Sequence, residues 1–366
     1  MYVYIHVPFC ARRCSYCDFA IAVRRSVPSE DFADAILREW DARLHDAAWT
    51  ASLVVETVYF GGGTPSRLDD AALSRILAGI RTDRPVAPDA EITLEANPDD
   101  VTAARAEAWR AAGVNRISLG VQSFDPGVLE WMHRTHTAAQ ANEAVRVLRA
   151  AGFGDLSLDL IFGLPKALGR DWGADLARAR ALEPDHLSCY GLTLEEHTPL
   201  ARWQRRGEAV MVDEERYAKE FLELHQSLQG WGFEHYEVSN AARPGHRARH
   251  NSGYWRRAPY LGLGPSAHSA TAEERRWNLR EWTAYERAGR EGRQVVAGRE
   301  RLDAGALRLE ALYLGLRTAD GVESGLVAAN VRARWVDAGW AIADANRLRL
   351  TPEGWLRLDA LVAEAA

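Results

Sequence analysis

The sequence predicts an α/β protein in which residues 1–240 form a partial barrel of parallel strands, followed by a small α+β domain. In the first part, short apolar runs of β type alternate with amphipathic stretches. Each of these stretches is long enough for a crossover helix, so consecutive strands should be parallel. Moreover, cysteines, a glycine run and carboxylates follow the ends of successive strands. The carboxyl ends of parallel strands form the ligand-binding face of such folds.

The expected elements make up about six βα units. Strands are expected at 2–7, 54–60, 91–95, 115–119, 156–161 and 186–193, and helices near 30–48, 69–82, 101–112, 138–151 and 171–182. A closed barrel needs eight units. We therefore expect an open, partial (β/α)6 barrel.

The remainder of the chain is expected to form two further parts. Residues 241–272 contain no acidic residue, and we interpret 241–280 as a segment that connects two domains. Its basic side chains include Arg243, His246, Arg247, Arg249, His250, Arg256 and Arg257. Expected helices at 302–316, 323–338 and 352–364, with short apolar runs at 340–343 and 347–350, predict a winged-helix-like domain over 281–366.

Composition excludes several classes of protein. The 366 residues are 47% hydrophobic and 26% charged, as in ordinary globular proteins. With 45 basic and 51 acidic residues, the net charge of −6 argues against a general nucleic-acid binder. We find no apolar stretch long enough to span a membrane and no signal-peptide pattern. Four cysteines in such a chain do not indicate a disulfide framework, so we expect a cytoplasmic protein.

Three cysteines lie together directly after the first expected strand. Cys10, Cys14 and Cys17 are spaced as Cys-x3-Cys-x2-Cys on one loop. A [4Fe–4S] cluster needs four ligands, so three thiolates leave one iron open to an external chelator. The alternatives are a structural zinc site, which normally uses two separated ligand pairs, or buried thiols without a metal. The spacing favours the iron–sulfur cluster over both.

Longer motifs resemble a known family. The spacing of the cysteines resembles the signature of radical SAM enzymes. Residues 4–10 (Tyr-Ile-His-Val-Pro-Phe-Cys) and 14–19 (Cys-Ser-Tyr-Cys-Asp-Phe) resemble the oxygen-independent coproporphyrinogen III oxidase group of that family. Further matching segments are 60–66, 95–98, 120–124, 134–136 and 159–165. The resemblance covers essentially the whole chain and implies a role in porphyrin metabolism.

The resemblance implies a cofactor and a set of residues that bind it. S-adenosylmethionine (SAM) would chelate the open iron, and an electron supplied by a donor protein through the cluster would cleave it to a 5′-deoxyadenosyl radical. The implied SAM-binding residues are Tyr4, Tyr16, Gly62, Gly63, Thr64, Glu95, Gln122, Arg134 and Asp159. The glycine run also has a physical reason, because glycine lets the backbone approach a ligand closely.

Two departures separate this chain from the decarboxylating oxidases. Those enzymes have a further cysteine where this chain has Phe19, and a long extension before the first strand. Both absences resemble the sister group of haem chaperones (HemW-type), and residues 250–255 reproduce its HNxxYW motif. The resemblance implies that His250 ligates haem iron, with the nearby arginines on the propionates. The plainer interpretation of His250 is an ordinary loop hydrogen bond.

Three functions follow from these observations. The favoured one is a haem chaperone that binds a [4Fe–4S] cluster and SAM and transfers haem to apo-haemoproteins such as respiratory enzymes. The second is an enzyme that decarboxylates coproporphyrinogen III through the adenosyl radical. The third is a zinc-stabilised α/β binding protein without redox chemistry. Phe19 favours the first over the second, and the cysteine spacing disfavours the third.

Overall fold

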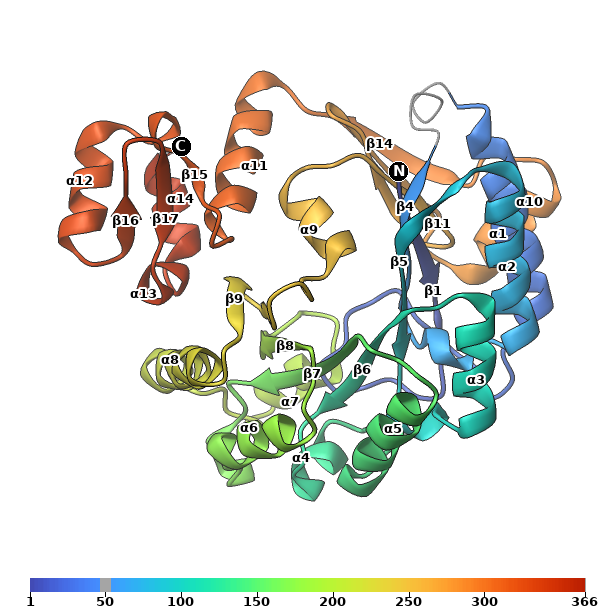
Figure 1. Ribbon diagram of the computed structural model, residues 1–366, viewed down its shortest axis with the longest axis horizontal. Helices are drawn as coiled ribbons and strands as arrows, with labels where there is room; N and C mark the ends of the chain where they lie inside the picture. Colours follow the sequence, from blue (N-terminus) through green and yellow to red (C-terminus); the bar gives the residue numbers. More distant parts are fainter. Residues whose placement is uncertain (47–53, 366) are drawn as a thin grey trace.

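A computed structural model describes residues 1–46 and 54–365. Its main sheet has 12 strands in the order β14-β13-β12-β11-β1-β4-β5-β6-β7-β8-β10-β9. The strands from β11 to β8 in this order are parallel to one another. Figure 1 shows the sheet curving into an open barrel, with α1, α2, α3, α5 and α6 along its convex side. The predicted partial barrel is confirmed.

The six barrel units agree closely with the expected ranges. The strands are β1 (Tyr2–Val7), β4 (Val55–Gly62), β5 (Val86–Ala96), β6 (Arg116–Gln122), β7 (Leu156–Phe162) and β8 (His186–Gly191). The helices are α1 (Ser29–Leu44), α2 (Asp70–Asp83), α3 (Ala103–Ala112), α5 (Ala138–Ala150) and α6 (Trp172–Ala181). The last residues of the expected first helix, 47 and 48, lie outside the described residues.

Several elements of the barrel were not expected. They are the short pair β2 (Phe9–Cys10) and β3 (Ala22–Val23), and the helices α4 (Pro126–Trp131), α7 (Pro199–Arg205) and α8 (Glu214–Gly230). Helix α8 begins at a clear signal, because the side chain of Asp213 accepts the backbone N–H of Arg216. It follows β8 in the chain and packs against α6 and β7.

The core lies between the curved sheet and its outer helices. Along β1, Val3, Ile5 and Val7 are fully buried and face this core, while Tyr2, Tyr4 and His6 alternate with them. In a strand, alternate side chains point to opposite faces of the sheet. The polar and aromatic side chains of β1 therefore face the inside of the barrel, where α9 (Arg249–Trp255) also lies.

The segment 241–280 does not simply connect two domains. It contributes β10 (Asn240–Ala242), β11 (Tyr260–Leu263), β12 (His268–Ala270) and β13 (Glu274–Asn278), and β14 (Val296–Arg301) continues the same sheet. Strand β11 pairs in parallel with β1, more than 250 residues away in sequence. The main sheet thus extends to residue 301, beyond the predicted boundary. Such a long-range pairing leaves no local signal in the sequence.

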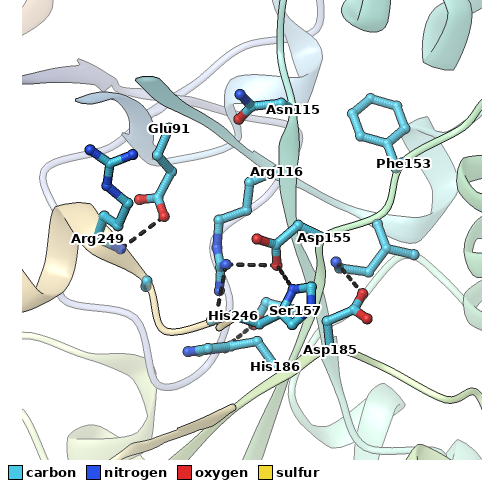
Figure 2. Close-up of polar contacts among 12 residues, drawn as sticks. Glu91, Asn115, Arg116, Phe153, Asp155, Ser157, Asp185, His186, His246 and Arg249 are labelled. Atoms are coloured by element: carbon cyan, nitrogen blue, oxygen red, sulfur yellow. Dashed lines mark hydrogen bonds and ion pairs between the residues drawn. The ribbon is translucent and has the colours of Figure 1, made fainter. Parts of the chain in front are cut away.

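Polar side chains hold the start of this segment against the barrel strands (Figure 2). Arg116 donates to Asp155 at 2.7 Å and to the carbonyl of His246 at 3.1 Å. The carboxylate of Glu91 accepts the backbone N–H groups of Arg249 and His250, at 2.8 and 2.9 Å. Glu91 thus satisfies the free N–H groups at the start of α9 and suits the positive end of its dipole. These contacts hold the segment against the barrel near the amino ends of its strands.

The C-terminal domain contains α11 (Ala304–Leu316), β15 (Val322–Glu323), α12 (Ala329–Asp337), β16 (Ala341–Ala343), β17 (Arg347–Leu350), α13 (Pro352–Trp355) and α14 (Leu358–Ala365). Its sheet has the order β15-β17-β16. The predicted sequence of helices and paired strands is present, and Trp335 is fully buried in the domain. Arg317 joins it to the barrel, pairing with Glu237 at 2.8 Å and lying 4.2 Å over the ring of Trp255. In residues 1–46 and 54–365, no helix is long and apolar enough to cross a membrane.

Candidate functional site

A cavity of about 410 Å³ lies at the carboxyl ends of the barrel strands. Most of the residues proposed from sequence line it together. They are Cys10, Cys14, Tyr16, Cys17, Gly62, Gly63, Thr64, Glu95, Gln122, Arg134 and Asp159. They come from the ends of β1, β4, β5, β6 and β7 and the loops that follow. The parallel arrangement of the strands brings these distant segments to one place.

The three cysteines of the first loop are free thiols on one wall of this cavity. Cys10 is buried and accepts a hydrogen bond from the hydroxyl of Thr64 at 3.4 Å, and Arg134 donates to the sulfur of Cys14 at 3.5 Å. Burial raises the pKa of Cys10, and it raises the pKa of Cys17 to about 12. At Cys10 and Cys17 a nearby positive charge, such as the iron of a bound cluster, would stabilise the thiolate.

The thiols do not form a site for a single ion. In the described part of the chain, no three His, Cys, Asp or Glu side chains converge as the ligands of one metal ion do. A four-coordinate zinc site needs its ligand atoms within roughly 2.3 Å of the ion. Three thiols that line a cavity of this size suit a larger inorganic group, so the donor set fits a [4Fe–4S] cluster.

The glycine loop after β4 packs directly against the cysteine loop. Gly62 has a φ of +110°, and a Cβ atom there would lie 2.6 Å from the ring of His6. A Cβ atom on Gly63 would lie 2.8 Å from the backbone of Pro8. Both positions therefore exclude larger residues. Their close packing holds the loop beside Cys10 and leaves its backbone exposed to the cavity.

Two carboxyl groups line the cavity, Glu95 on β5 and Asp159 on β7, with β6 between these strands. Glu95 accepts the hydroxyl of Tyr59 at 2.8 Å and the N–H of Gly62 at 3.1 Å. Asp159 accepts the hydroxyl of Ser118 at 2.8 Å. Burial raises the pKa of Glu95 to about 7 and that of Asp159 to about 6. A cationic or hydroxyl-bearing ligand would stabilise their charged forms.

Arg134 occupies the wall between the cysteine loop and β6. Its Nη2 donates to Asn97 at 2.6 Å and to the carbonyl of Gly120 at 2.9 Å. Its Nε is buried without a hydrogen-bond partner among the described residues. A buried donor without a partner is costly, and a ligand carboxylate would satisfy it.

Gln122 adopts a strained conformation beside this arginine. Its φ is +67°, and the pairing of β6 with β7 shifts register between Gly120 and Gln122. Such irregularities redirect side chains and cluster at functional sites. Here the irregularity places Gln122 on the cavity wall.

Comparison with known proteins gives the family. Residues 4–177 match the model of the radical SAM superfamily. The haem chaperone HemW of Mycobacterium tuberculosis is 38% identical over 98% of this chain and 93% of its own. The HemW of Synechocystis is 37% identical over 87% and 78%. The chain belongs to the HemW family within the radical SAM superfamily.

A solved structure supports the fold of this HemW-family chain. The coproporphyrinogen III oxidase HemN of Escherichia coli superposes with a TM-score of 0.82, over 99% of this chain and 88% of that one, at 23% identity. At this identity the likeness concerns the fold alone. It agrees with the barrel and C-terminal domain described above.

Two of the proposed residues lie outside the cavity of this HemW-family protein. Tyr4 lies in a neighbouring cavity, with its hydroxyl 3.1 Å from Nδ1 of His6. His250 is 1% exposed, and its ring nitrogens contact Thr57 and Tyr254, both at 2.7 Å. Neither nitrogen of His250 is therefore free to ligate iron as the side chains stand. Its role as a haem ligand remains a prediction.

The arginines expected to pair with propionates have other partners. Arg247 pairs with Glu234, Arg249 with Asp89, and Arg257 with Glu310, at 2.9, 3.1 and 2.8 Å. These ion pairs fasten the segment to the barrel and to α11. At these three positions the arginines therefore stabilise the fold through ion pairs.

Asn97 and Tyr190 are among the cavity residues that were not singled out from the sequence. Asn97 binds Arg134, and Tyr190 lines the cavity at the end of β8, where it is 43% exposed. The rule of strand ends could have found Tyr190, because it lies near the carboxyl end of the sixth strand, as Asp159 lies in the fifth. The adjacent Cys189 is buried.

Proposed function

We propose that this protein is a haem chaperone that binds a [4Fe–4S] cluster and SAM and passes haem to apo-haemoproteins. The observation that supports it most is that three free thiols and a glycine loop line one cavity in a HemW-family chain. Relatives called haem chaperones align along nearly its whole length. The four free cysteines agree with work in the cytoplasm, where thiols stay reduced.

Cys10, Cys14 and Cys17 would hold the cluster, leaving one iron for SAM. When bound, the cluster and SAM together supply one-electron chemistry. Thr64 and Arg134 would stabilise the thiolates, because both donate hydrogen bonds to sulfur atoms in the cavity. An electron donor protein would reduce the cluster from outside.

The rest of the cavity would orient SAM. Gly62, Gly63 and Thr64 would face its methionyl amino end, and Arg134 its carboxylate. Glu95 and Asp159 would bind the ribose hydroxyls or the sulfonium, since their raised pKa values favour a ligand that stabilises the carboxylate. Tyr16 and Gln122 complete the wall of the cavity.

Haem titration of the anaerobically reconstituted protein tests this function. We expect a saturable complex, followed by transfer of haem to an apo-haemoprotein such as a respiratory enzyme. Incubation with coproporphyrinogen III, SAM and a reductant should yield no decarboxylated product. Absence of saturable haem binding would overturn the proposal, and appreciable decarboxylation would replace it with the enzymatic function. One zinc ion and no iron in the purified protein would refute the cluster.

A further inference from the structure

A second cavity, of about 310 Å³, adjoins the cluster cavity inside the barrel. Asp18 and Phe19 line both cavities, directly after the last cysteine of the cluster loop. Phe19 is 59% exposed and lines both cavities, so its ring is accessible to a ligand in either of them.

Four of the ten residues that line the second cavity are tyrosine or phenylalanine. Tyr4, Tyr254 and Tyr260 line it, and the rings of Tyr254 and Tyr260 meet edge to face with centroids 4.6 Å apart. Aromatic walls with a few polar groups are typical of sites for flat, largely apolar ligands. Tyr254 belongs to the HNxxYW motif, so the motif contributes to this cavity through its tyrosine.

His268 on β12 supplies an imidazole to this cavity. The side chain is exposed, and its ring stacks at 6.1 Å on that of Trp277. Within residues 1–46 and 54–365, its ring nitrogens have no hydrogen-bond partner. A neutral imidazole keeps a free lone pair on one of its ring nitrogens. This is the form that ligates iron.

The other histidines near this cavity lack a free nitrogen. In His6, Nδ1 contacts the hydroxyl of Tyr4 at 3.1 Å and Nε2 contacts the carbonyl of Ala20 at 3.0 Å. Both nitrogens of His250 are likewise engaged, and its side chain is fully buried. Ligation by either residue would break buried hydrogen bonds, whereas ligation by His268 breaks none.

Arg280 adds a cationic group to the same wall. Its Nη2 donates to the backbone carbonyl of Asp18 at 3.4 Å, and in the described residues it forms no ion pair with a carboxylate. A guanidinium group matches the two oxygens of a carboxylate. Arg280 therefore has donors left for a propionate, unlike the paired arginines beneath the barrel.

We propose that the second cavity is the haem site, with His268 as an axial ligand of the iron and Arg280 paired with a propionate. The proposal rests on the haem-binding function proposed above. The porphyrin would lie against the tyrosines, with Phe19 between it and the cluster. Because His268 is exposed, this edge of the haem would remain accessible to a recipient protein.

Haem titration of cluster-loaded variants tests the assignment. We expect His268→Ala to lose the absorption and resonance Raman signature of histidine ligation and to bind haem at least about tenfold more weakly. His250→Ala is the matched control and should keep the ligation signature. His268→Gly with added imidazole should recover the spectrum, which a merely structural loss would not. Unchanged ligation in His268→Ala, with loss in His250→Ala, would overturn the proposal in favour of His250.

A second arm tests Arg280. Arg280→Ala should weaken binding of haem but leave binding of haem dimethyl ester, which has no free carboxylate, unchanged. Equal weakening of both ligands would refute the propionate contact. If wild-type protein binds no haem saturably, the proposed function itself fails, and this outcome is distinct from a wild type that binds haem independently of His268.

Discussion

Replacing Glu95 by Gln should make the stability of the cluster-free protein less dependent on pH. Burial raises the pKa of Glu95 from 4.5 to about 7. The folded protein therefore holds this proton more tightly than the unfolded chain does. Between these two pH values unfolding releases a proton, so the wild-type protein loses stability as the pH rises. A glutamine at this position has no proton to release and abolishes this loss.

The magnitude follows from the two pKa values. One pKa unit corresponds to about 1.4 kcal/mol, so the stability of the wild type should fall by about 2 to 3 kcal/mol between pH 5 and pH 8 through Glu95. Glutamine can still accept the hydroxyl of Tyr59, but its amide nitrogen cannot accept the N–H of Gly62. The free energy of unfolding of the variant therefore differs from that of the wild type by an amount that does not depend on pH. The informative quantity is the change in the free energy of unfolding between pH 5 and pH 8. Asp159 is present in both proteins.

Urea unfolding at pH 5 and pH 8 measures this difference. Tyr59→Phe is a control that should change the pH dependence in the opposite direction to Glu95→Gln, because the hydroxyl of Tyr59 lowers the pKa of Glu95. Its removal should raise that pKa further and move the loss of stability to higher pH. Equal dependence on pH in the wild type and Glu95→Gln would show that Glu95 ionises freely, and it would refute the description of the cavity.

Two further changes test the loop and the domain contact. Gly63→Ala places a Cβ atom 2.8 Å from the backbone of Pro8, so it should cost about 1–3 kcal/mol of stability and reduce the iron content. Gly154→Ala is the control and should do neither, because no atom of the described residues lies within 4 Å of the added Cβ atom. Unchanged unfolding and iron in Gly63→Ala would contradict the close packing of the two loops. Arg317→Ala removes the ion-pair partner of the buried Glu237, which among the described residues keeps only the hydrogen bond from Asn240. The change should cost about 3 kcal/mol in thermal unfolding, against less than about 1 kcal/mol for Arg334→Ala at an exposed pair. Similar losses in both variants would show that Arg317 does not join the domain to the barrel.

The sequence predicted the cluster cavity well because its signals are local. Each strand of the barrel ends at a residue of distinctive chemistry, and the parallel topology brings these ends together without further information. Gly62 and Gly63 were identified for the same reason, since only glycine fits at both positions. Asp213, which begins α8, shows that a helix with a local signal can still be overlooked.

The second cavity could not be predicted, because its walls depend on long-range pairing. His268 reaches the barrel only because β11 pairs with β1 and β12 with β11. The sequence suggested His250 through its motif, but a motif does not show whether a nitrogen is free. Tyr254 lies one turn from His250 on α9, but Thr57, which contacts the other nitrogen, lies on β4 and is 193 residues away in sequence.

The central claim is that SAM binds the open iron of the cluster. Electron paramagnetic resonance and electron–nuclear double resonance of the reduced, reconstituted protein with isotopically labelled SAM test it most directly. Three cysteine ligands leave one iron open, so the nitrogen and carboxylate oxygen of SAM should show hyperfine coupling to the cluster. Cys14→Ala should lose the cluster and the coupling together. The account would be contradicted if saturating SAM left the spectrum of the cluster unchanged. It would also be contradicted if the protein held no cluster after reconstitution.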